Sequence, residues 1–442
     1  MNKMVFTLVA AVAVANCTFA QAKVQAEKTA PVQITGTAPE ELPPTQAMVA
    51  EKTVQDMVDE YLAGQGWSGG RNDKNGRTFY IATGSAIVRA PRTGRNYIKS
   101  RSDAFSRAML AAQENMVSYL TAEIGTTTEQ VTVEGDYGAV GANRDAVESD
   151  PNSLTGKIDK FLQGKIEKAL AAEGMDPKTA TKEAKARIAK KLLASEQFVK
   201  VIKSAATAES SAMQAICTFE GKGDAEHGEV GVVAVWSPKL QEMAMSIATK
   251  KPVAGVKPKK PIVQQVSENP EALLSTFGVQ QKIDEHGNLV LVSFAQAGAV
   301  KDTGLAVDNA KSRARTMAQG MIREFAGASY KVSSDLLSAE STEVFEKAAE
   351  AYESVGAFSR TIKAESANMK LPGISTVKTW QMKHPFSGLM VYGCICSWSP
   401  VQAAHAAAVL EGTAGDSGAR QTPGGQPKTG AGAGQSGDVD AF

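Results

Sequence analysis

Histidine and cysteine are scarce in this sequence, and their scarcity argues against most metal chemistry. The 442 residues include four histidines and four cysteines. No His-Glu-x-x-His motif and no pair of histidines at ligand spacing occurs, so neither a catalytic nor a structural zinc site is expected. The glycine-rich runs, such as Gly64–Gly70, do not stand between a strand and a helix. We therefore predict no enzyme, no cofactor and no phosphate-binding loop.

The sequence also lacks an excess of positive or negative charge, and it lacks long apolar runs. The net charge is +1 and 21% of the residues are charged, so no global field favours nucleic acid as a partner. Beyond the N-terminal segment, no stretch is apolar over the ~20 residues that a membrane-spanning helix needs. We expect at most peripheral contact with a membrane.

Residues 1–22 have the order of a secretory signal peptide. Lys3 precedes an apolar stretch, and Ala20-Gln21-Ala22 supplies a cleavage site. The mature chain is predicted to be exported to the periplasm, the outer membrane or the extracellular space. Cys17 leaves a lipid anchor open as an alternative, although Asn16 precedes it where a small residue is expected. Without Cys17, the remaining three cysteines are too few for a disulfide framework.

Several sequence blocks occur twice, in one order. A short apolar run ends in Trp-Ser-Pro at Val232–Pro238 and again at Cys394–Pro400, with an offset of 162 residues. A Ser-Arg-Ala helix at 103–113 returns at 309–319, and an Ala-Glu-Ser block at 208–213 returns at 364–369. Segments with a turn followed by a strand precede the helix in both places. Four recurrences in one order indicate a tandem duplication.

The repeats predict an α+β fold of two duplicated domains. Each is a small, mainly antiparallel sheet packed by an Ala-rich helix, and the first carries a helical insertion at about 152–203. Helices are expected at Thr45–Ala63 and from Glu268 to about Gln281, ahead of the strands. The predicted boundaries are a signal peptide at 1–22, a disordered linker at 23–44, a first repeat at 45–249, a Pro/Lys linker at 250–265, a second repeat at 266–411 and a disordered Gly-rich tail at 412–442.

Cys394 and Cys396 are the weak candidates for a metal site. Residues two apart on a strand point to one side, so both sulfurs could hold a soft metal. Their counterparts in the first repeat are Val232 and Ala234, which favours packing in the core. A disulfide of either thiol with Cys217 is a third alternative.

The recurring charged and aromatic residues are interpreted as anchors of the repeated fold. Arg107 and Arg313 recur in the shared helix, and Glu209 and Glu365 recur in the Ala-Glu-Ser block, so we expect two salt bridges. An anion site on the arginines is the alternative.

Two tryptophans recur in the same way. Trp236 and Trp398 close the last strand of each repeat. Such large side chains are expected to anchor the core there, and ligand stacking is the alternative.

A resemblance to a known family rests on the Ala-rich helix and on two segments near the end of the second repeat, LPGISTVKTWQM (371–382) and LMVYGCICSW (389–398). Each repeat resembles the small bacterial outer-membrane lipoprotein domain that also forms the N-terminus of the flagellar T-ring assembly protein. The resemblance implies a small α+β fold with a non-enzymatic assembly or surface role.

The predicted function is that of an envelope structural or assembly protein that contacts other envelope proteins or itself. The alternatives are a periplasmic ligand-binding protein that uses the cleft between the repeats, and a hydrolase of unrecognised type. A cleft with convergent polar groups would favour the ligand-binding protein, and two perturbed carboxylates in it would favour the hydrolase.

Overall fold

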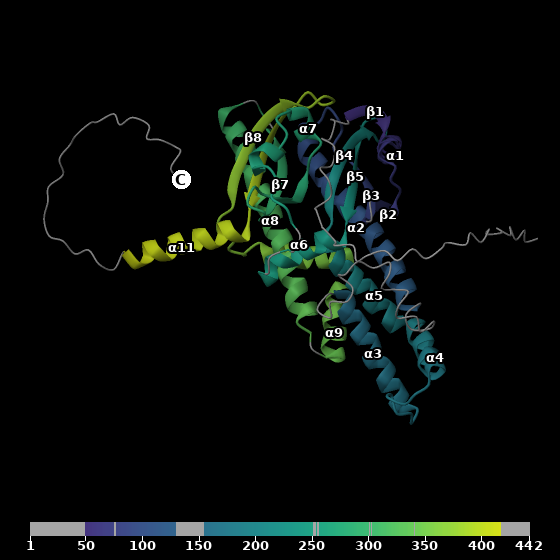
Figure 1. The fold of residues 1–442 in the computed structure, drawn as a ribbon. Coiled ribbons are helices and arrows are strands. Elements are labelled where there is room, and N and C mark those ends of the chain that lie inside the picture. Colours follow the sequence, from purple (N-terminus) through teal and green to yellow (C-terminus); the bar gives the residue numbers. More distant parts are fainter. Residues whose placement is uncertain are drawn as a thin grey trace, which may run out of the picture. The chain divides into compact units, whose positions relative to one another are not determined.

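The computed structural model describes residues 49–416, apart from 75–76, 130–153, 251–252, 254–255, 300, 302 and 340. The predicted signal peptide, the linker at 23–44 and the tail beyond residue 416 lie outside the described residues. All described residues belong to one compact unit, so both predicted repeats lie within it (Figure 1).

The first repeat builds a five-stranded sheet with the strand order β1-β4-β5-β3-β2. All neighbouring strands are antiparallel except β1, which runs parallel to β4. The strands are β1 (Val49–Thr53), β2 (Gly70–Lys74), β3 (Arg77–Ile87), β4 (Gln214–Lys222) and β5 (Gly228–Trp236), and the helices before and after β2–β3 are α1 (Val54–Gln65) and α2 (Tyr97–Glu129).

The second repeat builds a four-stranded antiparallel sheet with the order β6-β7-β9-β8. Its elements are α7 (Pro270–Leu274), β6 (Gly278–Ile283), β7 (Leu289–Gly298), α8 (Gly304–Val332), β8 (Ser375–Lys383) and β9 (Met390–Trp398). This order repeats β2-β3-β5-β4 of the first sheet, as a duplication predicts. The α+β class is confirmed.

The central helices lie close on their sheets through small side chains. Ala104, Ala108 and Ala112 on α2 are fully buried, and so are their counterparts on α8, 206 residues later (Ala310, Ala314 and Ala318). Spacings of four residues place each set on one helix face. An alanine face allows the backbone of α2 to approach the backbone of β3 directly.

Trp-Ser-Pro ends a strand and begins a helix in both repeats. The helices are α6 (Pro238–Thr249) and α11 (Pro400–Asp416). The hydroxyl of Ser237 accepts from the backbone N–H of Leu240 at 3.2 Å, and Ser399 accepts from Gln402 at 3.1 Å. Serine therefore caps the helix, and proline occupies its first turn, where no hydrogen-bond donor is needed.

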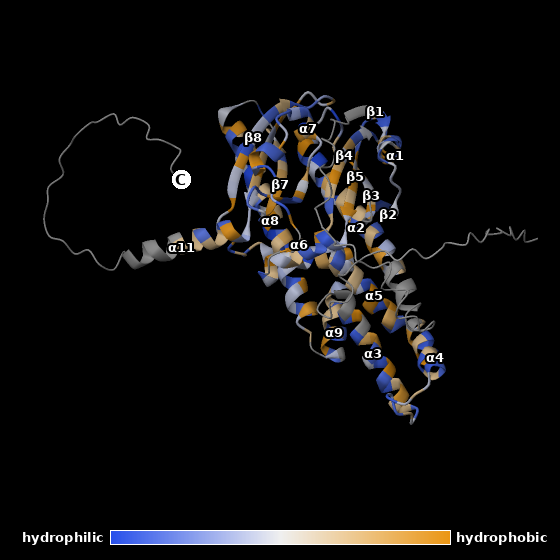
Figure 2. Cartoon of the chain, viewed as in Figure 1, coloured by the Kyte–Doolittle hydropathy of each residue, from blue (hydrophilic) through white to orange (hydrophobic). Residues whose placement is uncertain are grey.

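Between the central helix and the closing hairpin, both repeats are helical. The predicted insertion at 152–203 consists of α3 (Leu154–Ala172), α4 (Lys182–Leu193) and most of α5 (Glu196–Glu209). The second repeat has α9 (Thr342–Ala349) and α10 (Val355–Ser366). Figure 2 shows polar and apolar residues mixed along α3 and α4, as expected for helices with one buried face.

Three boundaries differ from the sequence-based expectation. The helix predicted at Thr45–Ala63 begins only after Thr53, whose hydroxyl caps α1, and Val49–Thr53 pairs with β4 instead. The helix predicted from Glu268 ends at Leu274, because the following residues pair with β7 as β6. The predicted disordered tail overlaps α11, which continues to Asp416.

The edge strands β2 and β6 were not predicted. β2 and β6 both begin with a glycine at positive φ, Gly70 (87°) and Gly278 (84°). Only glycine adopts this backbone conformation without strain, and it turns the chain into the edge strand. In both repeats a glycine therefore marks the start of the edge strand.

The linker predicted at 250–265 is bound to the second repeat. The backbone N–H of Lys259 donates to Asp284 at 2.9 Å, and the side chain of Gln265 donates to Ile283 at 2.7 Å. A 3₁₀ helix, η3 (Ile262–Gln265), forms its end. The described part of the linker is therefore held against the β6–β7 turn, and is more than an extended spacer.

Candidate functional site

The recurrent arginines have equivalent roles, but these are not the predicted salt bridges. Arg107 donates to the backbone oxygen of Ile87 at 2.6 Å, and Arg313 donates to Gly298 at 2.7 Å. Ile87 and Gly298 are the last residues of the equivalent strands β3 and β7. Each arginine thus binds the carbonyl at the end of the strand before its helix.

The recurrent glutamates do not pair with those arginines. Glu365 lies 3.2 Å from Lys331 instead. Glu209 is buried, and its backbone oxygen accepts from the indole N–H of Trp236 at 2.8 Å. The prediction of paired side chains was wrong because sequence recurrence marks equivalent positions, and says nothing of which positions face each other.

The two tryptophans are buried at equivalent strand ends. Trp398 is 1% exposed and donates to the backbone oxygen of Pro372 at 3.0 Å. Trp236 is 6% exposed and packs edge-on against Tyr80 with ring centroids 5.6 Å apart. Both have the surroundings of a core anchor, and neither presents a face for ligand stacking.

Cys394 and Cys396 point to the same side of β9, as the spacing predicted. Their sulfurs are 3.8 Å apart and buried. Within the described residues, no group of three or more metal-binding side chains occurs. Cys217 belongs to a different hydrophobic cluster, with α1, so the alternative of a disulfide with Cys217 is wrong.

The junction between the repeats holds a buried polar network that the sequence did not reveal. Arg101 on α2 forms a salt bridge with Glu220 on β4 and donates to Gln296 on β7 at 2.8 Å. Tyr97 donates to Glu220 at 2.6 Å, and His384 lies 3.0 Å from the same carboxylate. We call Tyr97, Arg101, Glu220, Gln296 and His384 the junction network.

The electrostatics of the junction network favour a buried carboxylate ion. Burial alone would raise the pKa of Glu220, but the charge of Arg101 and hydrogen bonds from His384 and Tyr97 outweigh it and lower this pKa to about 2. Burial lowers the pKa of His384, against the hydrogen bond with Glu220. The backbone N–H of Ser387 donates to Nδ1 of His384, so a neutral ring carries its proton on Nε2 and donates it to Glu220.

This network joins residues of both repeats and is closed to solvent. Arg101, Glu220 and His384 are each no more than 2% exposed, so a substrate has no access to the carboxylate. At the offset of 206 residues between α2 and α8, the counterpart of Arg101 is Val307. Arg101 is therefore not a recurring residue, and recurrence did not indicate it. One local signal was a glutamate within a mostly apolar part of β4, AICTFEG.

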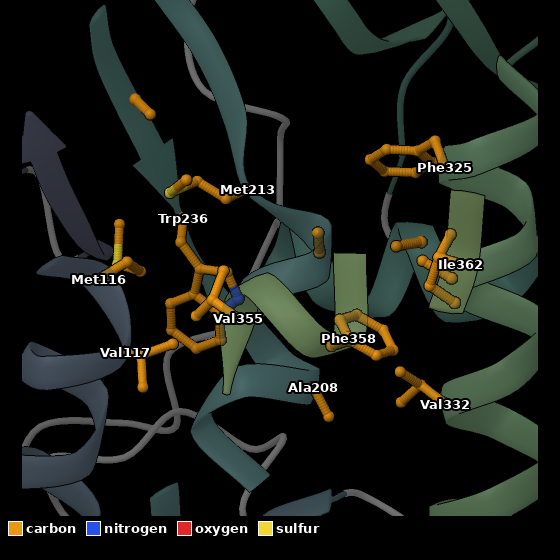
Figure 3. Close-up of a cluster of buried hydrophobic side chains, with 14 of the residues drawn as sticks. Met116, Val117, Ala208, Met213, Trp236, Phe325, Val332, Val355, Phe358 and Ile362 are labelled. Atoms are coloured by element: carbon orange, nitrogen blue, oxygen red, sulfur yellow. The ribbon is translucent and has the colours of Figure 1, made fainter. Parts of the chain in front are cut away.

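A second feature at the junction is a cavity of about 250 Å³ with walls from both repeats. The first repeat contributes α2 and the start of β4, and the second contributes β6, α8 and α10. The apolar lining includes Phe105, Met109, Leu110, Met213, Met321, Phe325, Phe358 and Ile362. Figure 3 shows Met213 from the first repeat and Phe325, Phe358 and Ile362 from the second within one buried cluster.

Polar groups are few in the cavity. Gln113 donates to Ser210 at 3.1 Å, and the buried hydroxyl of Ser211 has no hydrogen-bond partner within the described part of the chain. Glu324 is the one carboxylate among the described lining residues, and burial raises its pKa. A single carboxylate does not provide the acid–base pair on which the hydrolase alternative depended.

The cavity is connected to the junction network through stacked rings. Phe105 lines the cavity and stacks on Phe277, with centroids 4.8 Å apart and an interplanar angle of 18°. The guanidinium of Arg101 lies 4.8 Å from the centroid of the Phe277 ring. The cavity wall is therefore held in place by the same contacts that join the repeats.

Comparison with known proteins gives a partial family match and one distant structural likeness. The model of a family described as a domain of unknown function, DUF6844, matches residues 152–249, from the helical insertion to the end of α6. No curated protein matches the chain. A 2.3 Å crystal structure of the hypothetical protein FTT1539c from Francisella tularensis is 18% identical, with a TM-score of 0.47, and the match covers 81% of this chain and 96% of that one.

Among the described residues, every helix is too short or too polar to cross a bilayer.

Proposed function

We propose that the protein is an exported, non-enzymatic binding protein that holds a small apolar ligand between its two repeats. The observation that carries this proposal is the Met- and Phe-lined cavity, to which both repeats contribute. An apolar cavity of about 150 Å³ already holds benzene in other proteins, so the volume here suits a larger aromatic or branched molecule. Binding sites for small molecules are commonly apolar with a few polar groups, as this one is.

Two further observations support a binding role. The cavity lies between segments far apart in the sequence, and the buried junction network fixes their relative position. Methionines 109, 213 and 321 line it, and their flexible side chains adapt to irregular ligands. Export follows from the signal peptide predicted at 1–22.

Filling the cavity should abolish ligand binding. The full mature chain is expected to bind N-phenyl-1-naphthylamine, a neutral probe whose fluorescence rises in apolar surroundings. Met109 and Met321 are half-buried lining residues, so Met109→Trp and Met321→Trp place bulk where the probe would lie. We expect each to weaken binding at least about ten-fold, which corresponds to 1.4 kcal/mol.

The matched control is Tyr119→Trp, which changes an exposed aromatic residue of α2 outside the lining. It should leave the affinity and the melting temperature unchanged. Absence of probe binding to the wild-type chain, or equal affinity of all three variants, would rule out the cavity as a binding site.

A second candidate function is assembly with other envelope proteins or with itself, and an exposed stripe on α11 favours it. Val401, Ala404, His405 and Ala408 are exposed and recur at spacings of three and four residues on one helix face. α6, its counterpart, buries a face of the same spacing, although at the offset of 162 residues its members Leu240, Met243, Ala244 and Ile247 correspond to Gln402, His405, Ala406 and Val409. Figure 1 shows α11 (yellow) leading away from the second sheet.

The occupant of this stripe that we propose is α11 of a second copy. No Asp, Glu, Lys or Arg occurs from Pro400 to Leu410, so two copies meet without repulsion between like charges. The small side chains at 404 and 408 allow the helices to approach closely, and an interface between identical patches closes into a two-fold dimer.

Charges on the stripe should prevent this association. The full mature chain is expected to show a concentration-dependent dimer by light scattering after size exclusion, and Ala404→Glu with Ala408→Glu should give a monomer. Ala225→Glu is the control, because it makes the same type of substitution at an exposed alanine in the β4–β5 turn, away from α11. A wild-type monomer at all concentrations, or a dimer that survives both charges, would contradict self-association through α11.

A further inference from the structure

The cavity contains one charged group whose presence the fold does not explain. Glu324 lies on α8 next to Phe325 and one helical turn from Met321, both of which also line the cavity. Its counterpart in the first repeat, at the offset of 206 residues, is Ser118. Positions that maintain the fold of a single repeat recur in both repeats, as the alanine faces of α2 and α8 do. Glu324 does not recur, so the repeated fold does not require a carboxylate there.

The carboxylate of Glu324 has no partner of its own. Among the residues that the structure describes, it forms no hydrogen bond and no ion pair. The positive charge of Lys363 acts on it only at a distance, because that lysine is exposed on α10. A partly buried carboxylate without a partner is unfavourable, and burial raises its pKa accordingly.

The remainder of the lining complements a positive charge. No Lys, Arg or His lies among the described lining residues, and the other polar groups are serines and one glutamine, all neutral. Phe105, Phe325 and Phe358 add three aromatic rings. Aromatic faces attract cations, and this attraction is strongest where water is excluded.

We infer that the cavity takes a small organic cation, a molecule with an apolar body and an ammonium group that pairs with Glu324. The apolar body lies among the phenylalanine and methionine side chains. The ammonium donates hydrogen bonds to the carboxylate of Glu324 and to the hydroxyl of Ser211, which has no partner among the described residues. This inference rests on the proposed binding function and adds the chemical class of the ligand.

Three probes of one size test the charge. The full mature chain is titrated at neutral pH with 3-phenylpropylamine, 3-phenylpropan-1-ol and 3-phenylpropanoate, each in competition with N-phenyl-1-naphthylamine. The amine should bind at least about ten-fold more tightly than the alcohol, as one partly desolvated charge pair allows, and the carboxylate should bind most weakly. Equal binding of amine and alcohol would overturn the inference.

Substitution of Glu324 identifies the group that selects the cation. Glu324→Gln keeps the shape and removes the charge, so the amine should lose its advantage while the affinity for the alcohol stays unchanged. Glu114→Gln removes an exposed carboxylate of α2 outside the lining and should leave the preference intact. A preference for the amine that survives Glu324→Gln would overturn the assignment of this residue.

The two proposals fail in different ways. If the naphthylamine probe binds but the amine shows no advantage, the cavity is a binding site and the class of ligand is wrong. If neither the probe nor any of the three phenylpropyl compounds binds, the proposed function itself fails. Melting temperatures of all variants are measured in parallel, so that a loss of binding is not confused with a loss of folding.

Discussion

Replacing Arg101 with methionine should lower the free energy of unfolding by about 3–5 kcal/mol, because it leaves the carboxylate of Glu220 buried without its counter-charge. Both side chains are only 2% exposed, so water cannot replace the lost guanidinium. The same substitution also removes hydrogen bonds to Gln296 and to the backbone oxygen of Leu274 in the second repeat. Urea denaturation followed by tryptophan fluorescence measures the change.

A double substitution separates the charge from the packing. Arg101→Met with Glu220→Gln removes both charges and should recover part of the loss, with a coupling energy of roughly 0.5–3 kcal/mol. Lys52→Met is the control, because Lys52 and Glu60 form an ion pair that is more than half exposed. Exposed pairs contribute about 0–1 kcal/mol. If Arg101→Met costs no more than Lys52→Met, the junction network does not hold the repeats together.

The pH dependence of stability provides an independent readout of this substitution. The pKa of Glu220 is lowered to about 2, so its contribution is complete above its ordinary pKa of 4.5 and is lost as the pH falls towards 2. The lowered pKa of His384 acts in the same direction, because below pH 6.5 the unfolded chain takes up a proton that the folded chain does not. The wild type should therefore lose stability in acid, and Arg101→Met should show a smaller loss between pH 4.5 and 2.

Replacing Gly84 with alanine should be strongly destabilising for a different reason, which is the close approach of β3 and α2. A Cβ atom at residue 84 would lie 2.2 Å from the backbone oxygen of Ala108 and 2.4 Å from the backbone nitrogen of Ala112. Neither atom belongs to a side chain that can rotate away, so the helix must move off the sheet. We expect a loss of about 1–3 kcal/mol or more, as for overpacked cores.

Gly64→Ala is the matched control for this prediction. Gly64 lies in α1, and an added Cβ there meets nothing within 4 Å. Alanine is the better helix former by roughly 0.5–1 kcal/mol, so this variant should be more stable than the wild type. Replacing glycine with alanine is thus expected to lower the free energy of unfolding at residue 84 and to raise it at residue 64. A Gly84→Ala variant as stable as the wild type would show that the contact between α2 and β3 is looser than the structure has it.

The repeated blocks predicted much of the fold because their signals are local. The Ala-rich helix faces follow from spacings of four residues, and the end of each copy follows from Trp-Ser-Pro, in which serine caps the next helix. The short strands β1, β2 and β6 were missed. Segments such as GRNDK in β2 lack an apolar alternation, and they pair at or near the edges of the sheets. Edge pairing leaves little trace in composition.

The candidate site was much less predictable. The predicted salt bridges were inferred from recurrence, which marks residues that each copy needs for its own fold. They involved Arg107, Arg313, Glu209 and Glu365. A site between the copies uses residues that occur once, such as Arg101 and Glu324. Residues unique to one copy and charged within an apolar stretch would have been a better guide.

The sequence by itself determined the local units, namely helices, strands, caps and their duplicated order, because each depends on residues within a few turns of one another. Only the tertiary structure decided which charged side chains are buried together and where a cavity remains. Arg101 meets Glu220 across 119 residues and Gln296 across 195. Contacts of that range arise when two sheets and their helices pack, and no local pattern encodes the pairing.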